Sequence, residues 1–517
     1  MIPRTYPSTL NPATGQRQLV ALFLNDVTGL QRWSDYIPVN FGKGTTLIEG
    51  SYDNNGYIAV QEITSGIGLI PFGDYVPVFF DPAATDTWQV SSNGFIPYGV
   101  SGVTSVPSLD IVFTRSDVLD PRITFTRAST ATRTNASGLI ESVAINGARF
   151  DYDPVTRAPK GLLIEEQRTN LLTYSEQFDN VLWVKINSTI AANTTTAPDG
   201  TLTSDTLIAN TSTAEHYADN PFSVISGNAY TFTCYVKAAG LTNIGLRFTV
   251  GTLWTGSVSP QTRFNLIDLT TLAVGGSPAS ASITNVGNNW YRVQMSVVAI
   301  STGTASARLH LMSGASNTFA GDGTSGIYIW GAQLEAGASA TSYIPTVASQ
   351  VTRAADVAVM TGTNFSSWYN QSEGTLYAEA VLNNAATTGG QIRRIADIND
   401  ASTNNRISFG RAAATAAALR VQYIVAGVPL NGTNGQTAVN VFPFVKVAVA
   451  YKATDYAFSA NGIPATTSTA ANVPIVTQLT IGSDALNSSL SMANGHIKQI
   501  SYYPRRLANE ELQGLTA

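Results

Sequence analysis

Short runs in which apolar and polar residues alternate recur along most of this chain, and they limit what it can fold into. In the middle of the chain they include AYTFTCYVKAA, NIGLRFTV, NWYRVQMSVVAI and GIYIWGAQLE. Alternation with a period of two places apolar side chains on one face of a strand and polar side chains on the other. Because the runs follow one another at hairpin-like intervals, they predict antiparallel sheets packed as sandwiches. We therefore expect an all-β protein.

Charged residues make up 12% of the chain, which is about half the usual share for a globular protein. The polar surface must then come from Thr, Ser, Asn and Gln. Such a surface suits β-sandwiches and large oligomeric interfaces, because charge is costly to bury. The net charge is −5 and no run of Lys or Arg is longer than two. This balance argues against nucleic acid as a partner, since phosphate binding needs a concentrated basic face.

The single cysteine, Cys234, excludes an internal disulfide, and its apolar strand setting predicts a buried, inert thiol. The first residues have no apolar core after a basic region, so no secretory signal is expected. No window approaches the ~20 apolar residues of a membrane span. We expect the protein to be assembled in the cytoplasm and to reach a cell exterior only within a released particle.

The length of 517 residues predicts about three domains. Residues 1–108 would form an N-terminal anchoring and oligomerisation domain, 109–160 a connector, 161–346 a jelly roll, and 347–517 a second sandwich. The first segment has short apolar runs interrupted by prolines, and it is dense in aromatic residues. Those aromatics could form a small core, or they could fill pockets on a partner or on symmetry mates. The sequence leaves both readings open.

The stretch 149–172, RFDYDPVTRAPKGLLIEEQRTNLL, marks the joint between the front part and the β-rich remainder. With ITFTRASTATRTNASGLIESV before it and TYSEQFDNVLWVK after it, it resembles a segment of tailed-bacteriophage virion proteins. The resemblance is specific over 120–184 and looser out to 346. In such fibres and head appendages the segment precedes carbohydrate-binding-like sandwiches. The resemblance implies a virion structural protein located in the virion, and leaves capsid, neck, tail and baseplate open.

Two further resemblances concern the sandwiches. The strand order of 161–346 resembles the jelly roll of carbohydrate-binding and galactose-binding-like modules. The end of the chain, QLTIGSDALNSSLSMANGHIKQISYYPRRLANEELQGL, resembles the closing strands of laminin-G-like and concanavalin-A-like sandwiches. The matching residues are Ile481, Gly482, Gly495, Ile497, Ile500, Tyr503, Arg505, Leu507, Glu510 and Leu512. A short terminal helix would open at 509–511 with acidic residues suited to its dipole.

Glycoside hydrolysis is the enzymatic alternative, because some concanavalin-A-like folds are glucanases. Those enzymes place carboxylates at alternate positions of one strand, flanking the sugar bond. The nearest stretch here is IADIND, in which Asp397 and Asn399 share a face while Ile395 holds the expected third position. The three histidines show no metal-ligand spacing, and no GxSxG, P-loop or GxGxxG motif follows a strand. The sequence therefore predicts no enzymatic activity.

No cofactor is expected from the sequence. A structural calcium ion is the alternative kept open, since sandwich modules hold such ions through Asp and backbone carbonyls. Asp322 in the GDGT loop, or Asp397 with Asp400, could serve. Ordinary turns explain both places better.

A glycan site would need exposed aromatics to stack on sugar rings, with polar groups for the hydroxyls. The candidates in the jelly roll are Trp254, Tyr217, Arg247 and Arg263, and those in the last sandwich are Trp368, Tyr369 and Arg411. Core packing is the alternative for every aromatic among them. Trp254 is the strongest exception, because GTLWTGS reads as a loop of small residues.

We favour a non-enzymatic virion component, such as a fibre, head appendage or decoration protein, that adheres to host-surface glycan. Its expected partners are other virion proteins and a host glycan, with neither nucleic acid nor membrane. A homotrimer is expected from the resemblance and from a low-charge surface that tolerates burial. The alternatives are a strict receptor-binding lectin of the tail and a polysaccharide-degrading enzyme.

Overall fold

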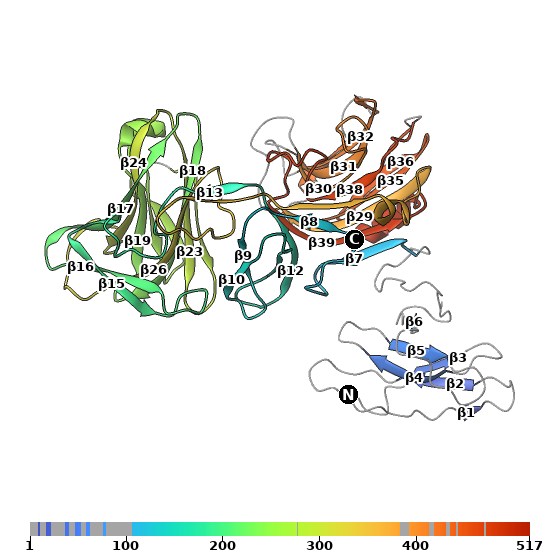
Figure 1. Cartoon of the computed structure of the whole chain (residues 1–517), viewed down its shortest axis with the longest axis horizontal. Coiled ribbons are helices and arrows are strands. Elements are labelled where there is room, and N and C mark those ends of the chain that lie inside the picture. Colours follow the sequence, from blue (N-terminus) through green and yellow to red (C-terminus); the bar gives the residue numbers. More distant parts are fainter. Residues whose placement is uncertain are drawn as a thin grey trace. The chain divides into compact units, whose positions relative to one another are not determined.

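The computed structural model describes residues 106–517, except 277, 383–391, 413–417, 431–434, 441–442 and 470–471 (Figure 1). For 435–440, and for six strands before residue 106, it describes the backbone alone. The chain divides into two compact units, Met1–Leu109 and Asp110–Ala517.

The first unit contains two three-stranded antiparallel sheets, ordered β1-β2-β3 and β4-β5-β6. Their strands are β1 (Thr9–Leu10), β2 (Arg17–Ala21), β3 (Ile37–Asn40), β4 (Leu47–Tyr52), β5 (Ile58–Glu62) and β6 (Val76–Val78). The anchoring role predicted for 1–108 depends on aromatic side chains that lie outside the described residues.

The jelly roll of the second unit consists of two antiparallel sheets around one apolar core. The first sheet has the order β14 (Val184–Ile186), β17 (Thr213–Val224), β24 (Gly303–Met312), β19 (Asn243–Phe248), β20 (Gln261–Asn265), β21 (Thr270–Ala273), and β25 (Thr318–Ala320) pairs with β17. The second has the order β15 (Ser188–Thr195), β16 (Ser204–Ala209), β26 (Gly326–Ala336), β18 (Ala229–Ala239), β23 (Tyr291–Val298), β22 (Ser280–Asn285). Two 3-10 turns, η2 (Gly251–Leu253) and η3 (Thr255–Ser257), follow β19.

A second sandwich closes the chain, with two eight-stranded antiparallel sheets. One sheet has the order β11 (Phe150–Tyr152), β12 (Pro159–Ile164), β39 (Gly495–Tyr503), β29 (Glu373–Leu382), β35 (Phe444–Lys452), β36 (Tyr456–Ala460), β37 (Thr466–Ser468), and β7 (Leu109–Val112) pairs with β39. The other has the order β33 (Val428–Pro429), β32 (Ala418–Val425), β31 (Arg406–Ala412), β30 (Ile392–Asn399), β38 (Gln478–Ile481), β28 (Val357–Thr361), β8 (Thr124–Thr126), and β34 (Gly435–Asn440) pairs with β32. The Tyr423 hydroxyl donates to the carbonyls of Ala450 and Ala457, so the two sheets face each other.

Four short strands and two helices complete the unit. The strands are β9 (Ala131–Thr134) with β10 (Ile140–Val143), and β13 (Arg168–Asn170) with β27 (Val351–Arg353); the helices are α1 (Thr363–Ser366) and α2 (Asn509–Thr516). None of the helices in the described part of the chain combines the length and the apolar character that crossing a membrane requires.

The all-β prediction is confirmed, and strand β18 shows why the alternation was informative. Phe232, Cys234 and Val236 lie in the jelly-roll core, whereas Tyr235 between them packs in a separate cluster with Trp330 and Tyr343. Burial raises the pKa of the Cys234 thiol to about 12, so the predicted inert thiol agrees with its setting. In the last sandwich, β35 and β36 follow each other along the chain and pair as an antiparallel hairpin.

A buried ion cluster lies where the joint stretch meets the segment that follows β27. This joint cluster consists of Arg127, Arg149, Glu165, Arg353 and Asp356, all of which are buried. The Arg127 Nη1 lies 3.0 Å from Asp356 Oδ1, and the Arg149 Nη1 lies 2.8 Å from Glu165 Oε2. Arg149 also donates to the Asp356 carboxylate. The two carboxylates outweigh the effect of burial and raise the pKa of Arg149. The cluster therefore ties segments more than 200 residues apart into one unit.

Candidate functional site

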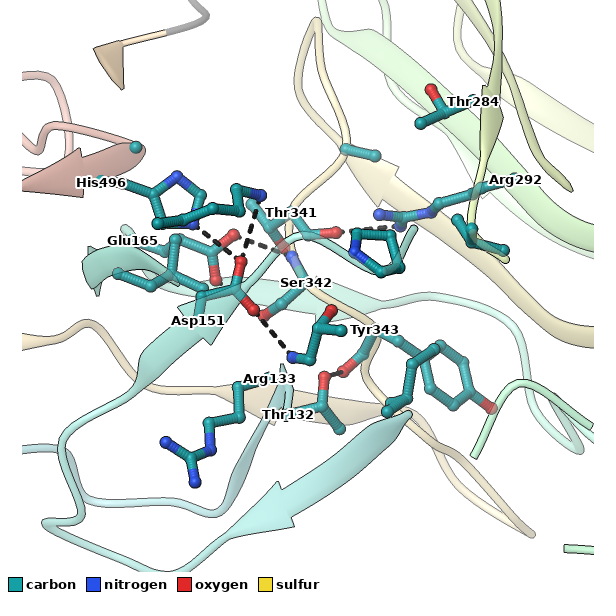
Figure 2. Close-up of a pocket in the computed structure, with 18 of the residues that line it drawn as sticks. Thr132, Arg133, Asp151, Glu165, Thr284, Arg292, Thr341, Ser342, Tyr343 and His496 are labelled. Atoms are coloured by element: carbon teal, nitrogen blue, oxygen red, sulfur yellow. Dashed lines mark hydrogen bonds and ion pairs between the residues drawn. The ribbon is translucent and has the colours of Figure 1, made fainter. Parts of the chain in front are cut away.

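A cavity of about 440 Å³ lies next to this cluster, and we call it the joint pocket (Figure 2). One wall is the outer face of strands β18, β23 and β22, and the other comes from β9, β11, β12 and β39. The loop 339–343 contributes the remaining lining. A volume of this size is within the range of about 300–1,000 Å³ found for small-molecule sites.

The sheet wall follows from the register of three antiparallel strands. Arg292 pairs with Thr284 on one side and with Tyr235 on the other, so these three side chains share one face. The Arg292 guanidinium lies 5.4 Å from the centroid of the Tyr235 ring. Its Nη2 donates to the Thr341 carbonyl at 2.9 Å and to Thr233 Oγ1 at 3.2 Å. Arg292 is thus held in place by neutral oxygens.

The opposite wall is organised around the Asp151 carboxylate. Asp151 Oδ2 accepts from His496 Nε2 at 2.8 Å and lies 3.2 Å from Lys160 Nζ, while Oδ1 accepts from the Thr134 amide at 2.7 Å. The register of β11, β12 and β39 brings these residues together, because Leu163 lies opposite His496. His496 and Lys160 outweigh burial and hold the pKa of Asp151 well below its usual range. Asp151 is therefore ionised and already has partners.

His496 is buried, and its Nδ1 has no hydrogen-bond partner among the described residues. Burial lowers the pKa of the imidazole, and the contact with Asp151 offsets this only in part. The ring is therefore neutral around pH 7.

We expect His496 to make the folded unit less stable in mild acid. The folded state favours the neutral ring, so stability from this group is present above the ordinary pKa of about 6.5 and is lost as the pH falls through the lower folded-state value. The charged groups that act on the His496 ring are Asp151, Lys160 and Glu165. His496→Gln, which cannot take up this proton, should lose less stability than the wild type between pH 7 and about 5. Urea unfolding at each pH measures this, and parallel curves for the two proteins would contradict it.

The joint pocket connects directly to the joint cluster. The Ser342 amide donates to Glu165 Oε1 at 2.8 Å, and its hydroxyl donates to Glu165 Oε2 at 2.7 Å (Figure 2). The same Oε2 accepts from Arg149. The two acids of the pocket lining, Asp151 and Glu165, are therefore neutralised by ion pairs within the protein.

The structure places four of the sequence-predicted glycan residues in packed surroundings. Trp254 is fully buried, stacks on Phe248 with ring centroids 4.9 Å apart, and donates from Nε1 to the Thr249 carbonyl at 2.8 Å. Its predicted exposure is wrong, because the two 3-10 turns fold the indole back into the core. Trp368 is buried and half-buried Tyr369 packs among aromatic rings. Arg411 is half-buried and donates to the Leu382 carbonyl.

The other three candidates lie together on the outer face of the sheet that contains β17, β19 and β20. Tyr217, His310, Gly245 and Arg263 occupy one row across four strands. The Arg308 guanidinium lies 3.4 Å from the centroid of the Tyr217 ring and so covers one face of it. Arg247 lies 3.7 Å from Glu215. This face presents charged groups that are largely paired with one another.

The residues predicted as candidates for calcium or for hydrolysis lie in turns or in a buried ion pair. Asp322 Oδ1 accepts from the amides of Thr324 and Ser325, and Asp400 Oδ1 accepts from the Ser402 amide, as in ordinary turns. Asp397 is fully buried 3.5 Å from Arg394 Nε, and burial raises its pKa to about 6. Within the described parts of the chain, no group of three or more His, Cys, Asp or Glu side chains could hold a metal ion.

The sequence patterns do not predict the residues of the joint pocket. Asp151 and Lys160 lie in the stretch that was singled out as the joint, but His496 and Arg292 lie far from it along the chain. The available signal for Arg292 was its polar position in an alternating strand. That signal alone could not indicate which of many such positions faces a cavity.

No protein-family model matches the chain. No curated protein matches it either. Among solved structures, the carbohydrate-binding module CBM40 of a Ruminococcus gnavus sialidase aligns at 12% identity and a TM-score of 0.22, covering 29% of this chain and 84% of that one. A Trypanosoma rangeli sialidase in complex with the inhibitor DANA aligns at 9% identity and a TM-score of 0.23, covering 99% and 93%.

One sequence prediction is corrected by these comparisons. The sequence predicts no enzymatic activity, yet two solved structures that align over nearly the whole chain are sialidases. We therefore withdraw that exclusion. TM-scores near 0.23 carry no argument about mechanism, so the alignments assign neither a reaction nor residues to this chain.

Proposed function

We propose that this chain is a structural protein of a virus particle and that its joint pocket binds glycan on a host surface. The pocket carries this proposal, because a cavity of about 440 Å³ is lined by hydroxyl, amide and charged groups. Such groups match the many hydroxyls of a sugar and fix its orientation. The particle assignment rests on the resemblance of 120–184 to tailed-phage virion proteins.

A bulky side chain at Thr284 is expected to block the joint pocket. Thr284 is exposed on the outer strand β22 and lines the pocket, so a larger side chain there narrows the cavity without altering the core. We expect the full-length chain to bind a subset of glycans on an array, and Thr284→Trp to lose that binding while its melting temperature is unchanged. Tyr217→Ala serves as the comparison, because Tyr217 lies on the outer face of the other jelly-roll sheet.

Two outcomes would contradict the site. Binding that survives Thr284→Trp but disappears in Tyr217→Ala would place glycan on the face of β17, β19 and β20 instead. An array without any bound glycan would remove the binding function. The same samples should be assayed for released reducing ends, because release would identify an enzyme that acts on its glycan.

The assembly is part of the same proposal. We expect a homotrimer whose N-terminal segment seats on other virion proteins, with the chain incorporated in the host cytoplasm. Sedimentation of the purified chain and of intact particles tests this. A monomer that never co-sediments with particles would contradict it.

A further inference from the structure

We infer that the joint pocket selects a glycan bearing a carboxylate, such as a uronic acid or a sialic acid. This inference rests on the proposed function and names the substrate class of the same site. The pocket lining contains cationic side chains, but both of its carboxylates are already paired with other groups of the protein.

Arg292 is the cationic residue on the sheet wall of the pocket. No ion pair joins the Arg292 guanidinium to a carboxylate of the described residues, and its hydrogen bonds go to a hydroxyl and a carbonyl oxygen. Its Nη1 makes no hydrogen bond to those residues, whereas its Nε is buried and closed to a ligand. A guanidinium with unused donors beside a cavity favours a planar, bidentate anion.

Lys160 is a cationic residue on the opposite wall of the pocket. Its ammonium group shares the Asp151 carboxylate with His496, and its side chain is 38% exposed. The other acid of the lining, Glu165, is engaged by Arg149 and Ser342. The lining therefore has cations on both walls, and its two carboxylates are both engaged by groups of the protein.

The aromatic residues of the lining also favour a charged sugar over a neutral one. A neutral sugar is commonly held by stacking on an open ring face, but Arg292 covers the Tyr235 ring and Tyr343 is buried. Selectivity in this pocket must then come from charge and hydrogen bonds. A sugar carboxylate between Arg292 and Lys160 would be held by both charge and hydrogen bonds.

The test compares ligands that differ only in charge. We expect the full-length chain to bind oligogalacturonate or a sialylated oligosaccharide at least tenfold more tightly than the methyl ester of the same compound. Arg292→Gln and Lys160→Gln should each weaken binding of the acid by about 10- to 100-fold, as for a lost hydrogen bond to a charged group. Binding of the ester should be almost unchanged in both variants.

Arg122→Gln is the matched control, because Arg122 forms a partly exposed pair with Asp120 and does not line the pocket. Lys160→Gln also guards against misfolding, since this side chain is partly exposed. Equal affinity for acid and ester, with no effect of either substitution, would overturn this inference and leave the glycan-binding proposal standing. Failure to bind any glycan would overturn both.

Discussion

Asp356→Ala is expected to lower the free energy of unfolding by about 3–5 kcal/mol, as found when one partner of a buried ion pair is removed. Asp356 is fully buried, and its carboxylate accepts from both Arg127 and Arg149. It also accepts from the Glu165 amide at 2.9 Å. Without it, two buried guanidinium groups lose their shared anion. Urea unfolding of the full-length chain measures the loss.

Two further variants separate charge from shape. Asp356→Asn keeps the size of the side chain, so a similar loss in this variant would assign the effect to the charge. Glu379→Ala removes one partner of a partly exposed pair with Lys498 at 3.0 Å, and it should cost about 1 kcal/mol or less. An Asp356→Ala protein as stable as the Glu379→Ala protein would show that the joint cluster does not hold the unit together.

The local parts of the fold could be predicted because they depend on neighbouring residues alone. Strands β18, β23 and β26 lie where the alternation placed them. The turn after β36 also follows its sequence, since Asn461 and Gly462 both have positive φ angles of 46° and 72°. Helix α2 begins at Asn509, and Glu511 accepts from the Ala508 amide at 2.8 Å.

The pairing between distant segments could not be predicted in this way. Strands β8 and β11 come from the segment interpreted as a connector, and β12 crosses from it into the segment predicted as the jelly roll, yet all three belong to the two sheets of the last sandwich. Alternation shows which face of a strand is apolar, but it does not identify the neighbouring strand. The joint pocket depends on such pairings, because Asp151 on β11 and Lys160 on β12 lie beside His496 only when β11 pairs with β12 and β12 pairs with β39.

The error at Trp254 has a related physical cause. Small residues on both sides of a tryptophan are typical of an exposed loop, but they also allow a tight turn that folds back on itself. Val250 adopts a left-handed conformation with φ of 57°, and Gly256 follows with φ of 83°. This backbone directs the indole into the jelly-roll core. Sequence composition alone does not distinguish the two cases.

Trp254→Ala is accordingly expected to lower the free energy of unfolding by about 3–5 kcal/mol, the range for deleting a large aromatic from a core. The indole stacks on Phe248 and contacts Tyr230 edge-on, with centroids 4.9 and 6.2 Å apart. The substitution leaves a cavity beneath these rings and leaves the Thr249 carbonyl without its donor. Chemical unfolding, followed by circular dichroism, measures the loss.

Trp254→Phe separates the structural role of this residue from a role in sugar binding. It keeps an aromatic ring in the core and removes the indole N–H, so the expected loss is about 1–3 kcal/mol. Because the residue is fully buried, the folded variant should bind glycan as the wild type does. Loss of glycan binding by a Trp254→Phe protein that is demonstrably folded would contradict the buried position and restore Trp254 as a stacking platform.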